Sequence, residues 1–226
     1  METDVRRLVR EAIEESDRDK ASAILLAWAE AHGYLRAINE ALGPVLLEIG
    51  RDYESGKPVS LAHGYIAAKV TEDLLSRAMT AEGRNAAPTK GPVVIGNIED
   101  DYHALGRKMV GAFLAAAGWK VRDLGNDVPA SVFVDEAVGQ GAKVIGVSAM
   151  MHLTALNILN VREEIDYRGL RGRIQLAVGG AIFVLRPELI QRVGGDGTAA
   201  NGLLAPALFD DLWRRATLAE QSNERS

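Results

Sequence analysis

The chain has 226 residues, of which 47% are hydrophobic and 25% are charged, and its net charge is −5. This composition suits a soluble globular protein with one large or two small domains, and the absence of a basic block argues against nucleic-acid binding. The lack of cysteine excludes disulfides, iron–sulfur clusters and thiolate zinc sites. The acidic N-terminus is not typical of a signal peptide, and no apolar run reaches the ~20 residues of a transmembrane helix. We therefore expect a cytoplasmic protein that does not bind membranes.

The first part of the chain is predicted to be helical throughout. Four segments show apolar residues at the three- and four-residue spacing of amphipathic helices. Pro44 is expected either to kink the third helix or to start a new one. Four helices with short connections predict a small antiparallel bundle as the first domain, residues 1–83. The predicted helical segments are residues 5–13, 21–31, 35–49 and 60–81.

Residues 82–91 form the predicted linker, because glycine, proline and small polar residues gather there. Beyond it, short runs rich in valine and isoleucine alternate with helical segments. This alternation predicts a flavodoxin- or Rossmann-like doubly wound parallel sheet covered on both faces, so that the fold class is α + α/β. The second domain covers residues 91–226. Its predicted strands are 93–98, 120–124, 144–147 and 174–178, with a fifth near 195–198, and its predicted helices are 105–117, 130–140, 154–165 and 186–193.

Asp101 and His103 follow the first predicted strand of this sheet directly. Right-handed crossovers bring all strand-to-helix loops to one edge, where ligands of open α/β sheets bind. A carboxylate beside an imidazole can fix its tautomer and raise its basicity, which suits a metal ligand. The later loops are rich in glycine, which lets a bulky ligand approach the backbone. Taken alone, these residues leave a metal and a phosphate ligand open.

The pattern Asp-x-His-x-x-Gly, followed by Ser-x-Leu and then by Gly-Gly, is the signature of the cobalamin-binding domain family. Residues 107–147 separate the first two parts here, and residues 151–178 separate the last two, as in that family. With its helical first part, the whole chain resembles the corrinoid proteins of methyltransferase systems and the cobalamin module of methionine synthase. The matching residues are Asp101, His103 and Gly106, then Ser148 and Met150, then Gly179 and Gly180.

The resemblance implies base-off/His-on binding, in which a histidine replaces the cofactor's own benzimidazole below the cobalt. It implies that His103 is the lower axial cobalt ligand, that Asp101 accepts a hydrogen bond from its other ring nitrogen, and that Ser148 extends this relay. The helical domain would cap the upper face of the cofactor, with Tyr53 and His63 as candidate cap residues. The further residues implied to bind the cofactor are Ala104, Gly106, Ala149, Met150, Thr154, Gly179, Gly180, Gly197 and Thr198.

The same resemblance implies a function in methyl transfer. The cofactor would alternate between cob(I)alamin and methylcobalamin, taking a methyl group from a methyl-donor methyltransferase and passing it to a methyl-acceptor methyltransferase. The chain would thus be a corrinoid carrier subunit rather than a stand-alone enzyme. A reductive activator is a further candidate partner, and a homodimer is a candidate assembly. Ala104 stands where corrinoid proteins usually carry an acid, and Thr198 stands where they carry tyrosine, so the methyl donor stays open.

Two other functions compete with the carrier. A cobalamin-based sensor would keep the cofactor and regulate a partner protein instead of moving a methyl group. A non-haem metal enzyme would use Asp101, His103 and His152 as two histidines and one carboxylate around a metal ion. The second alternative leaves the glycine-rich loops without a purpose.

Overall fold

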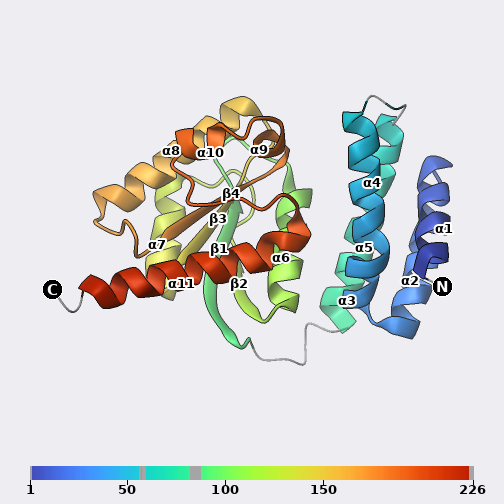
Figure 1. Cartoon of the computed structure of the whole chain (residues 1–226), viewed down its shortest axis with the longest axis horizontal. Helices are drawn as coiled ribbons and strands as arrows, with labels where there is room; N and C mark the ends of the chain where they lie inside the picture. The colour runs from blue at the N-terminus through green and yellow to red at the C-terminus, as the bar shows by residue number, and fades with distance from the viewer. Residues whose placement is uncertain (1, 56, 58–59, 82–87, 224–226) are drawn as a thin grey trace. The chain divides into compact units, whose positions relative to one another are not determined.

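The protein is described from a computed structural model that defines residues 2–55, 57, 60–81 and 88–223. The chain divides into two compact units, Met1–Ala86 and Ala87–Ser226, each with its own core (Figure 1). Most of the predicted linker, residues 82–87, lies outside the described part. Among the described helices, none combines the length and the apolar character needed to cross a membrane.

The first unit is helical, as predicted. The third predicted helix is a continuous stretch of three pieces, and α2 packs between α1 and α5. Asp17 begins α2, because its side chain accepts a hydrogen bond from the backbone N–H of Lys20 at 2.9 Å. The elements are α1 (Glu2–Glu14), α2 (Arg18–His32), α3 (Tyr34–Arg36), the π-helix η1 (Ala37–Leu42), α4 (Gly43–Glu54) and α5 (Leu61–Ala81).

Pro44 neither breaks nor sharply ends the third helical stretch. The preceding π-helix carries the chain past the proline, with Gly43 N–H donating to the carbonyl of Ile38. Pro44 has no N–H to offer the carbonyl of Glu40, four residues earlier. Arg6 Nε of α1 donates to that carbonyl instead, at 2.5 Å. An inter-helix hydrogen bond therefore replaces the one that proline removes.

The second unit contains a four-stranded parallel sheet in the order β2-β1-β3-β4. Residues of β1 alternate between two cores because successive side chains of a strand point to opposite faces. Val93 and Ile95 join Leu114 and Phe209, whereas Val94 joins a larger cluster on the other face. The strands are β1 (Lys90–Asn97), β2 (Trp119–Asp123), β3 (Val144–Ser148) and β4 (Gln175–Gly179).

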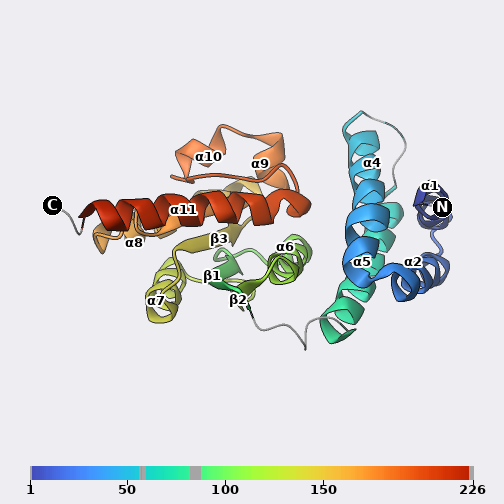
Figure 2. The same ribbon diagram turned by 60° about the horizontal axis from the view of Figure 1, so that its bottom comes forward.

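Helices cover both faces of this sheet, as the predicted fold class requires. Figure 2 shows the strands lying between α11 and α7. The two hydrophobic cores agree with this arrangement, because α6 and α11 contribute to the core on one face of the sheet and α7 and α8 to the core on the other. The elements are α6 (Ala104–Ala116), α7 (Ala130–Gln140), α8 (His152–Tyr167), α9 (Ala181–Leu185), α10 (Leu189–Arg192), the 3-10 helix η2 (Gly202–Leu204) and α11 (Ala205–Asn223).

Three local predictions for the second unit need correction. The expected fifth strand is an isolated bridge between Ala177 and Gly197. The expected helix at 186–193 is the short α10, because Pro187 disfavours helical geometry at Arg186, whose φ is −137°. The long C-terminal α11 was not predicted, although Leu208 and Leu212 have the spacing of a buried helix face.

The order of the strands places the ligand edge between β1 and β3. The chain leaves β1 toward β2 on one side and later crosses to β3 on the other, which makes this the topological switch point of the sheet. The two strands end in register, with Asn97 opposite Ser148, and Ile98 N–H donates to the carbonyl of Ser148 at 3.1 Å. The loop carrying Asp101 and His103 therefore starts beside the loop that follows β3.

Candidate functional site

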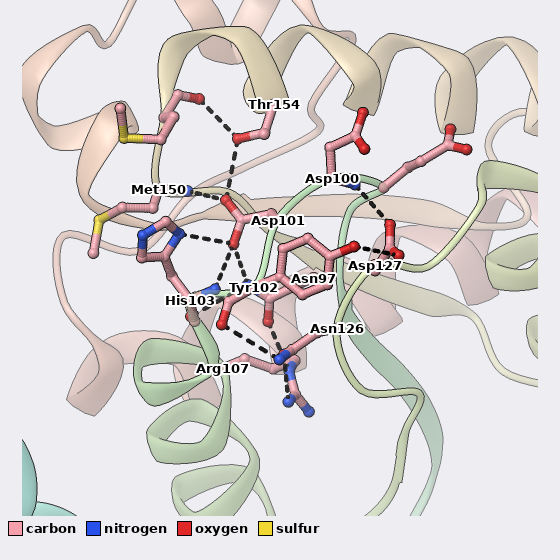
Figure 3. A network of polar contacts seen from close by, with 12 residues as sticks. Asn97, Asp100, Asp101, Tyr102, His103, Arg107, Asn126, Asp127, Met150 and Thr154 are labelled. Carbon is pink, nitrogen blue, oxygen red and sulfur yellow. Dashed lines mark hydrogen bonds and ion pairs between the residues drawn. The ribbon is translucent and has the colours of Figure 1, made fainter.

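Asp101 is the centre of a polar network at this switch point (Figure 3). It is fully buried, and both of its carboxylate oxygens accept hydrogen bonds. Oδ1 accepts from Asn97 Nδ2 at 2.7 Å and from His103 N–H at 3.0 Å. Oδ2 accepts from Met150 N–H at 2.7 Å and from Thr154 Oγ1 at 3.1 Å. Groups from β1, the following loop and the start of α8 thus converge on one side chain.

These hydrogen bonds keep Asp101 ionised. Burial alone would raise the pKa of Asp101, because it removes water from the charged form. The backbone N–H groups of Met150 and His103, together with the Asn97 amide and the Thr154 hydroxyl, outweigh that effect and lower the pKa below its ordinary value. A buried carboxylate that stays charged at neutral pH is a strong acceptor for an imidazole N–H.

His103 immediately precedes α6 and lies beside this carboxylate. Its side chain is 52% exposed, and Nδ1 lies 3.5 Å from Asp101 Oδ1. Within the described residues, Nε2 makes no hydrogen bond. An N–H at Nδ1 directed to Asp101 leaves the lone pair of Nε2 free, which is the tautomer that a metal ligand needs.

The loop that presents Asp101 and His103 is held from the side of β2. Asp127 accepts from Asp100 N–H at 2.9 Å and from the hydroxyl of Tyr102 at 2.7 Å, and the hydroxyl lowers the pKa of Asp127. Asp100 and Asp127 both have positive φ, 67° and 56°, which an aspartate tolerates better than most residues. The position of His103 is therefore determined by contacts on both sides of its loop.

A cavity of about 260 Å³ lies between the sheet, α6 and the segment that leads into α11. Aliphatic side chains and backbone line most of it. Glycines let the walls approach closely, and Gly180 is the clearest case. Its φ is 111°, and a Cβ at this position would lie only 1.9 Å from the carbonyl oxygen of Ala149, so no larger residue fits without a shift. Its six glycines are Gly96, Gly106, Gly146, Gly179, Gly180 and Gly202.

A comparison with known protein families matches residues 91–206 to the B12 binding domain. Curated relatives include trimethylamine corrinoid protein 1 of Methanosarcina mazei, 33% identical over 191 residues that cover 83% of this chain and 87% of the relative. Another is dimethylamine corrinoid protein 1 of Methanosarcina acetivorans, 32% identical over 197 residues that cover 85% of this chain and 91% of the relative. The chain belongs to the B12-binding domain family. The resemblance seen in the sequence is confirmed.

Solved structures share the fold of this B12-binding protein. The monomethylamine corrinoid protein of Methanosarcina barkeri is 23% identical with a TM-score of 0.71, covering 92% of this chain and 98% of that one. The methanol:cobalamin methyltransferase complex of the same organism contains a chain that is 24% identical with a TM-score of 0.51, covering 96% of this chain and 84% of that one. At these identities the likeness supports the fold.

The cofactor of the B12-binding domain is cobalamin or a related corrinoid, and the site fits such a group. A half-exposed imidazole with one nitrogen directed to a buried carboxylate suits cobalt. The neighbouring cavity is largely apolar and lined by glycine, which suits a bulky organic group. His103 and Asp101 would hold the metal end of the cofactor, and the cavity would hold another part of it.

The predicted site residues fall into three sets in the structure. One set surrounds or belongs to the carboxylate network: Asp101, His103, Met150 and Thr154. A second set lines the cavity: Gly106, Ser148, Gly179 and Gly180. A third set stands beside these features without joining either: Ala104 as the first residue of α6, the buried Ala149, and Gly197 and Thr198 in the segment after α10.

Ser148 is the last residue of β3 and lines the cavity. Among the described residues its hydroxyl makes no hydrogen bond to Asp101, and Thr154 donates to that carboxylate instead. The relay through Ser148 stays a prediction. The C-terminal side of the cavity was also missed, because Ala199, Ala200 and Phe209 line it where Gly197 and Thr198 were expected. The apolar face of α11 was the sequence signal that could have predicted a helix on this side of the cavity.

The two candidate cap residues belong to the helical unit. Tyr53 lies in α4, and its side chain is outside the described part. His63 lies in the first turn of α5, where its N–H donates to Ser60 Oγ at 3.2 Å and its Nδ1 accepts from Ser60 N–H at 3.4 Å. These contacts form a local N-terminal cap of the helix. The role of both residues toward the cofactor stays a prediction.

The alternative metal site does not assemble in the described residues. No group of three or more histidine, cysteine, aspartate or glutamate side chains is arranged there to hold a metal ion. His152 begins α8, and its Nδ1 is buried without a hydrogen-bond partner. The non-haem site of Asp101, His103 and His152 is therefore not supported.

Proposed function

We propose that this protein carries a methyl group between methyltransferase partners on the cobalt of a bound cobalamin, with His103 as the lower axial ligand. The observation that carries the proposal is the pairing of the exposed His103 imidazole with the buried, ionised Asp101. When bound, the cofactor supplies a metal centre that can accept and release a methyl group. The protein's own residues bind and orient it and control the proton of the axial imidazole.

The names of the relatives support methylamines as the donor class. Curated relatives of this chain are trimethylamine and dimethylamine corrinoid proteins, and the chain spans about nine tenths of their length. A structural neighbour belongs to a methanol:cobalamin methyltransferase complex. We infer that a methylamine methyltransferase donates the methyl group and that a second methyltransferase accepts it. A reductive activator and a homodimer remain parts of this proposal.

Asp101 would orient the axial imidazole. Because its pKa is lowered, Asp101 carries a negative charge at neutral pH. The fixed negative charge beside Nδ1 would hold the imidazole with its N–H at that nitrogen and leave Nε2 free for the cobalt.

The helical unit is proposed to cover the upper face of the cofactor and to uncover it for each partner. Tyr53 and His63 are the proposed cap residues. Such a cover would exclude water from the reacting methyl group, as lids do in other systems.

The test is a methylation assay on the full-length protein loaded with cobalamin. The reduced protein is mixed with the methylamine methyltransferase and with trimethylamine, dimethylamine or methanol in separate reactions, and methylation is followed by the visible spectrum. We expect methylation with a methylamine and none without the methyltransferase. A protein that binds only adenosylcobalamin and changes its assembly on illumination would contradict the carrier function.

A further inference from the structure

Arg107 is a buried cation one turn into α6, with only 6% of its surface exposed. Its guanidinium reaches three groups on β1, on β2 and in the loop after β2. Nε donates to Asn97 Oδ1 at 2.7 Å and Nη2 donates to Asn126 Oδ1 at 3.1 Å (Figure 3). Nη1 donates to Asp123 Oδ1. All three nitrogens of the forked guanidinium therefore donate hydrogen bonds, and Nε donates to the fully buried amide of Asn97.

Asn97 connects this arginine to the axial site. Its amide nitrogen donates to Asp101 Oδ1 at 2.7 Å and to the carbonyl of His103 at 3.2 Å. An amide can turn by half a rotation and exchange its oxygen and nitrogen, and the wrong orientation would place its oxygen against the Asp101 carboxylate. Arginine only donates hydrogen bonds, so Arg107 accepts no orientation except the one that faces it with the amide oxygen.

We propose that Arg107 is a positioning residue for His103, acting through Asn97 and Asp101. The proposal rests on the proposed role of His103 as axial ligand. Arg107 fixes the Asn97 amide, the amide fixes Oδ1 of Asp101, and that oxygen lies against Nδ1 of His103. Each link is a hydrogen bond or close contact between groups whose geometry depends on the next, as in other buried polar networks.

The burial of Arg107 supports a positioning role over a packing role. Burying a guanidinium is costly, and an apolar side chain of similar volume would pack between helix and sheet at least as well. The carboxylate of Asp123 is 40% exposed, so an arginine could pair with it without being buried as Arg107 is. The hydrogen bond to the fully buried Asn97 does require a buried guanidinium.

The decisive experiment compares Arg107→Met with the matched control Arg122→Met. Arg122 is another arginine of this unit with a carboxylate partner, but it is exposed and pairs with Glu136. Both full-length variants and the wild type are loaded with cobalamin and reduced to the Co(II) state at one fixed pH. Electron paramagnetic resonance then reports the fraction of cobalt that carries an axial imidazole nitrogen.

We expect Arg107→Met to lower the ratio of His-bound to His-free cobalt about three- to tenfold, within or below the range of direct ligand-orienting partners. Arg122→Met should match the wild type. In an Asn97→Ala background, Arg107→Met should change the ratio no further, because the loss of the Asn97 amide has already removed the hydrogen bonds that link Arg107 to Asp101. Should Arg107→Met fail to fold, Arg107→Lys decides: it keeps the charge but loses the fork, and the ratio should still fall.

A second readout needs no cofactor. Met150 N–H donates to Asp101 Oδ2, so its hydrogen exchange reports how well the carboxylate is held. Arg107→Met should accelerate exchange at Met150 more than global unfolding accounts for, whereas Arg122→Met should not. This arm separates the two proposals, because it tests the Arg107–Asn97–Asp101 link even if the wild type shows no axial nitrogen and the role of His103 fails.

Two results would overturn the inference. One is an unchanged ratio of His-bound to His-free cobalt with a lower melting temperature, which would make Arg107 a structural residue only. The other is weaker cobalamin binding with an unchanged ratio, which would make Arg107 a direct contact of the cofactor through the cavity that it lines.

Discussion

Thr154 Oγ1 lies 3.1 Å from Asp101 Oδ2 and ties the first turn of α8 to the loop after β1. The hydroxyl also lies 3.0 Å from the carbonyl of Met151, and the two acceptors share its single proton. The charged carboxylate is the stronger acceptor of the two. The buried charge therefore accepts a hydroxyl from the first turn of α8, whereas Ser148 of the sequence motif lies at the end of β3.

This contact predicts different effects for two hydroxyl deletions in the cofactor-free protein. Thr154→Val should lower the free energy of unfolding by about 1 kcal/mol, because it removes a hydrogen bond to a buried charge. Ser148→Ala should change it little, since Ser148 makes no hydrogen bond to Asp101. Urea denaturation measures both. An equal loss in the two variants would show that Ser148 shares the role of Thr154.

Asp101 should make the stability of the protein depend on pH in the acid range. Its pKa is lowered in the folded state, so its stabilising contribution is present above the ordinary aspartate pKa of about 4 and is lost as the pH falls through the folded-state value. Urea titrations between neutral pH and about pH 3 should show Asp101→Asn less stable at neutral pH by about 2 kcal/mol, with a smaller loss on acidification. Parallel curves for wild type and variant would contradict this assignment.

Removing the proposed axial ligand should abolish the His-bound state. His103→Ala is expected either to lose cobalamin or to bind it without the visible spectrum of an imidazole-ligated cobalt. His32→Ala is the matched control, because His32 belongs to the helical unit and stacks on Trp28 with ring centroids 4.3 Å apart. A visible spectrum that is unchanged in His103→Ala would refute the ligand role.

Two neighbouring glycines should respond differently to the same substitution. Gly180→Ala should destabilise the protein by at least about 2 kcal/mol, because φ is 111° and the new Cβ meets a carbonyl oxygen. Gly179→Ala has open space for its Cβ and should leave the melting temperature nearly unchanged. Because Gly179 lines the cavity, however, the added methyl group should reduce the space for the cofactor, so cobalamin should bind more weakly. Unaltered cobalamin affinity in Gly179→Ala would show that the cofactor does not occupy this wall.

Much of the fold could be predicted because its signals are local. Apolar spacing within single segments predicted the helices of the first unit and the strands and crossover helices of the second. The exceptions had local causes that compete with periodicity. Pro187 shortened the helix expected at 186–193, and the segment around Gly197 forms one bridge in place of a fifth strand. The π-helix before Pro44 was not predicted, although Pro44 had marked this position as one where a helix kinks or restarts.

The sequence by itself determined the family and its cofactor, because Asp101, His103 and the glycine pair at 179–180 are read directly from a linear motif. The tertiary structure decided which groups act on those residues. Thr154 and Met150 reach Asp101 only because β3 lies beside β1, and Arg107 reaches it only through the amide of Asn97. Hydrogen bonds between separate loops depend on strand order and on the packing of helices onto the sheet, and no local pattern of residues contains that information.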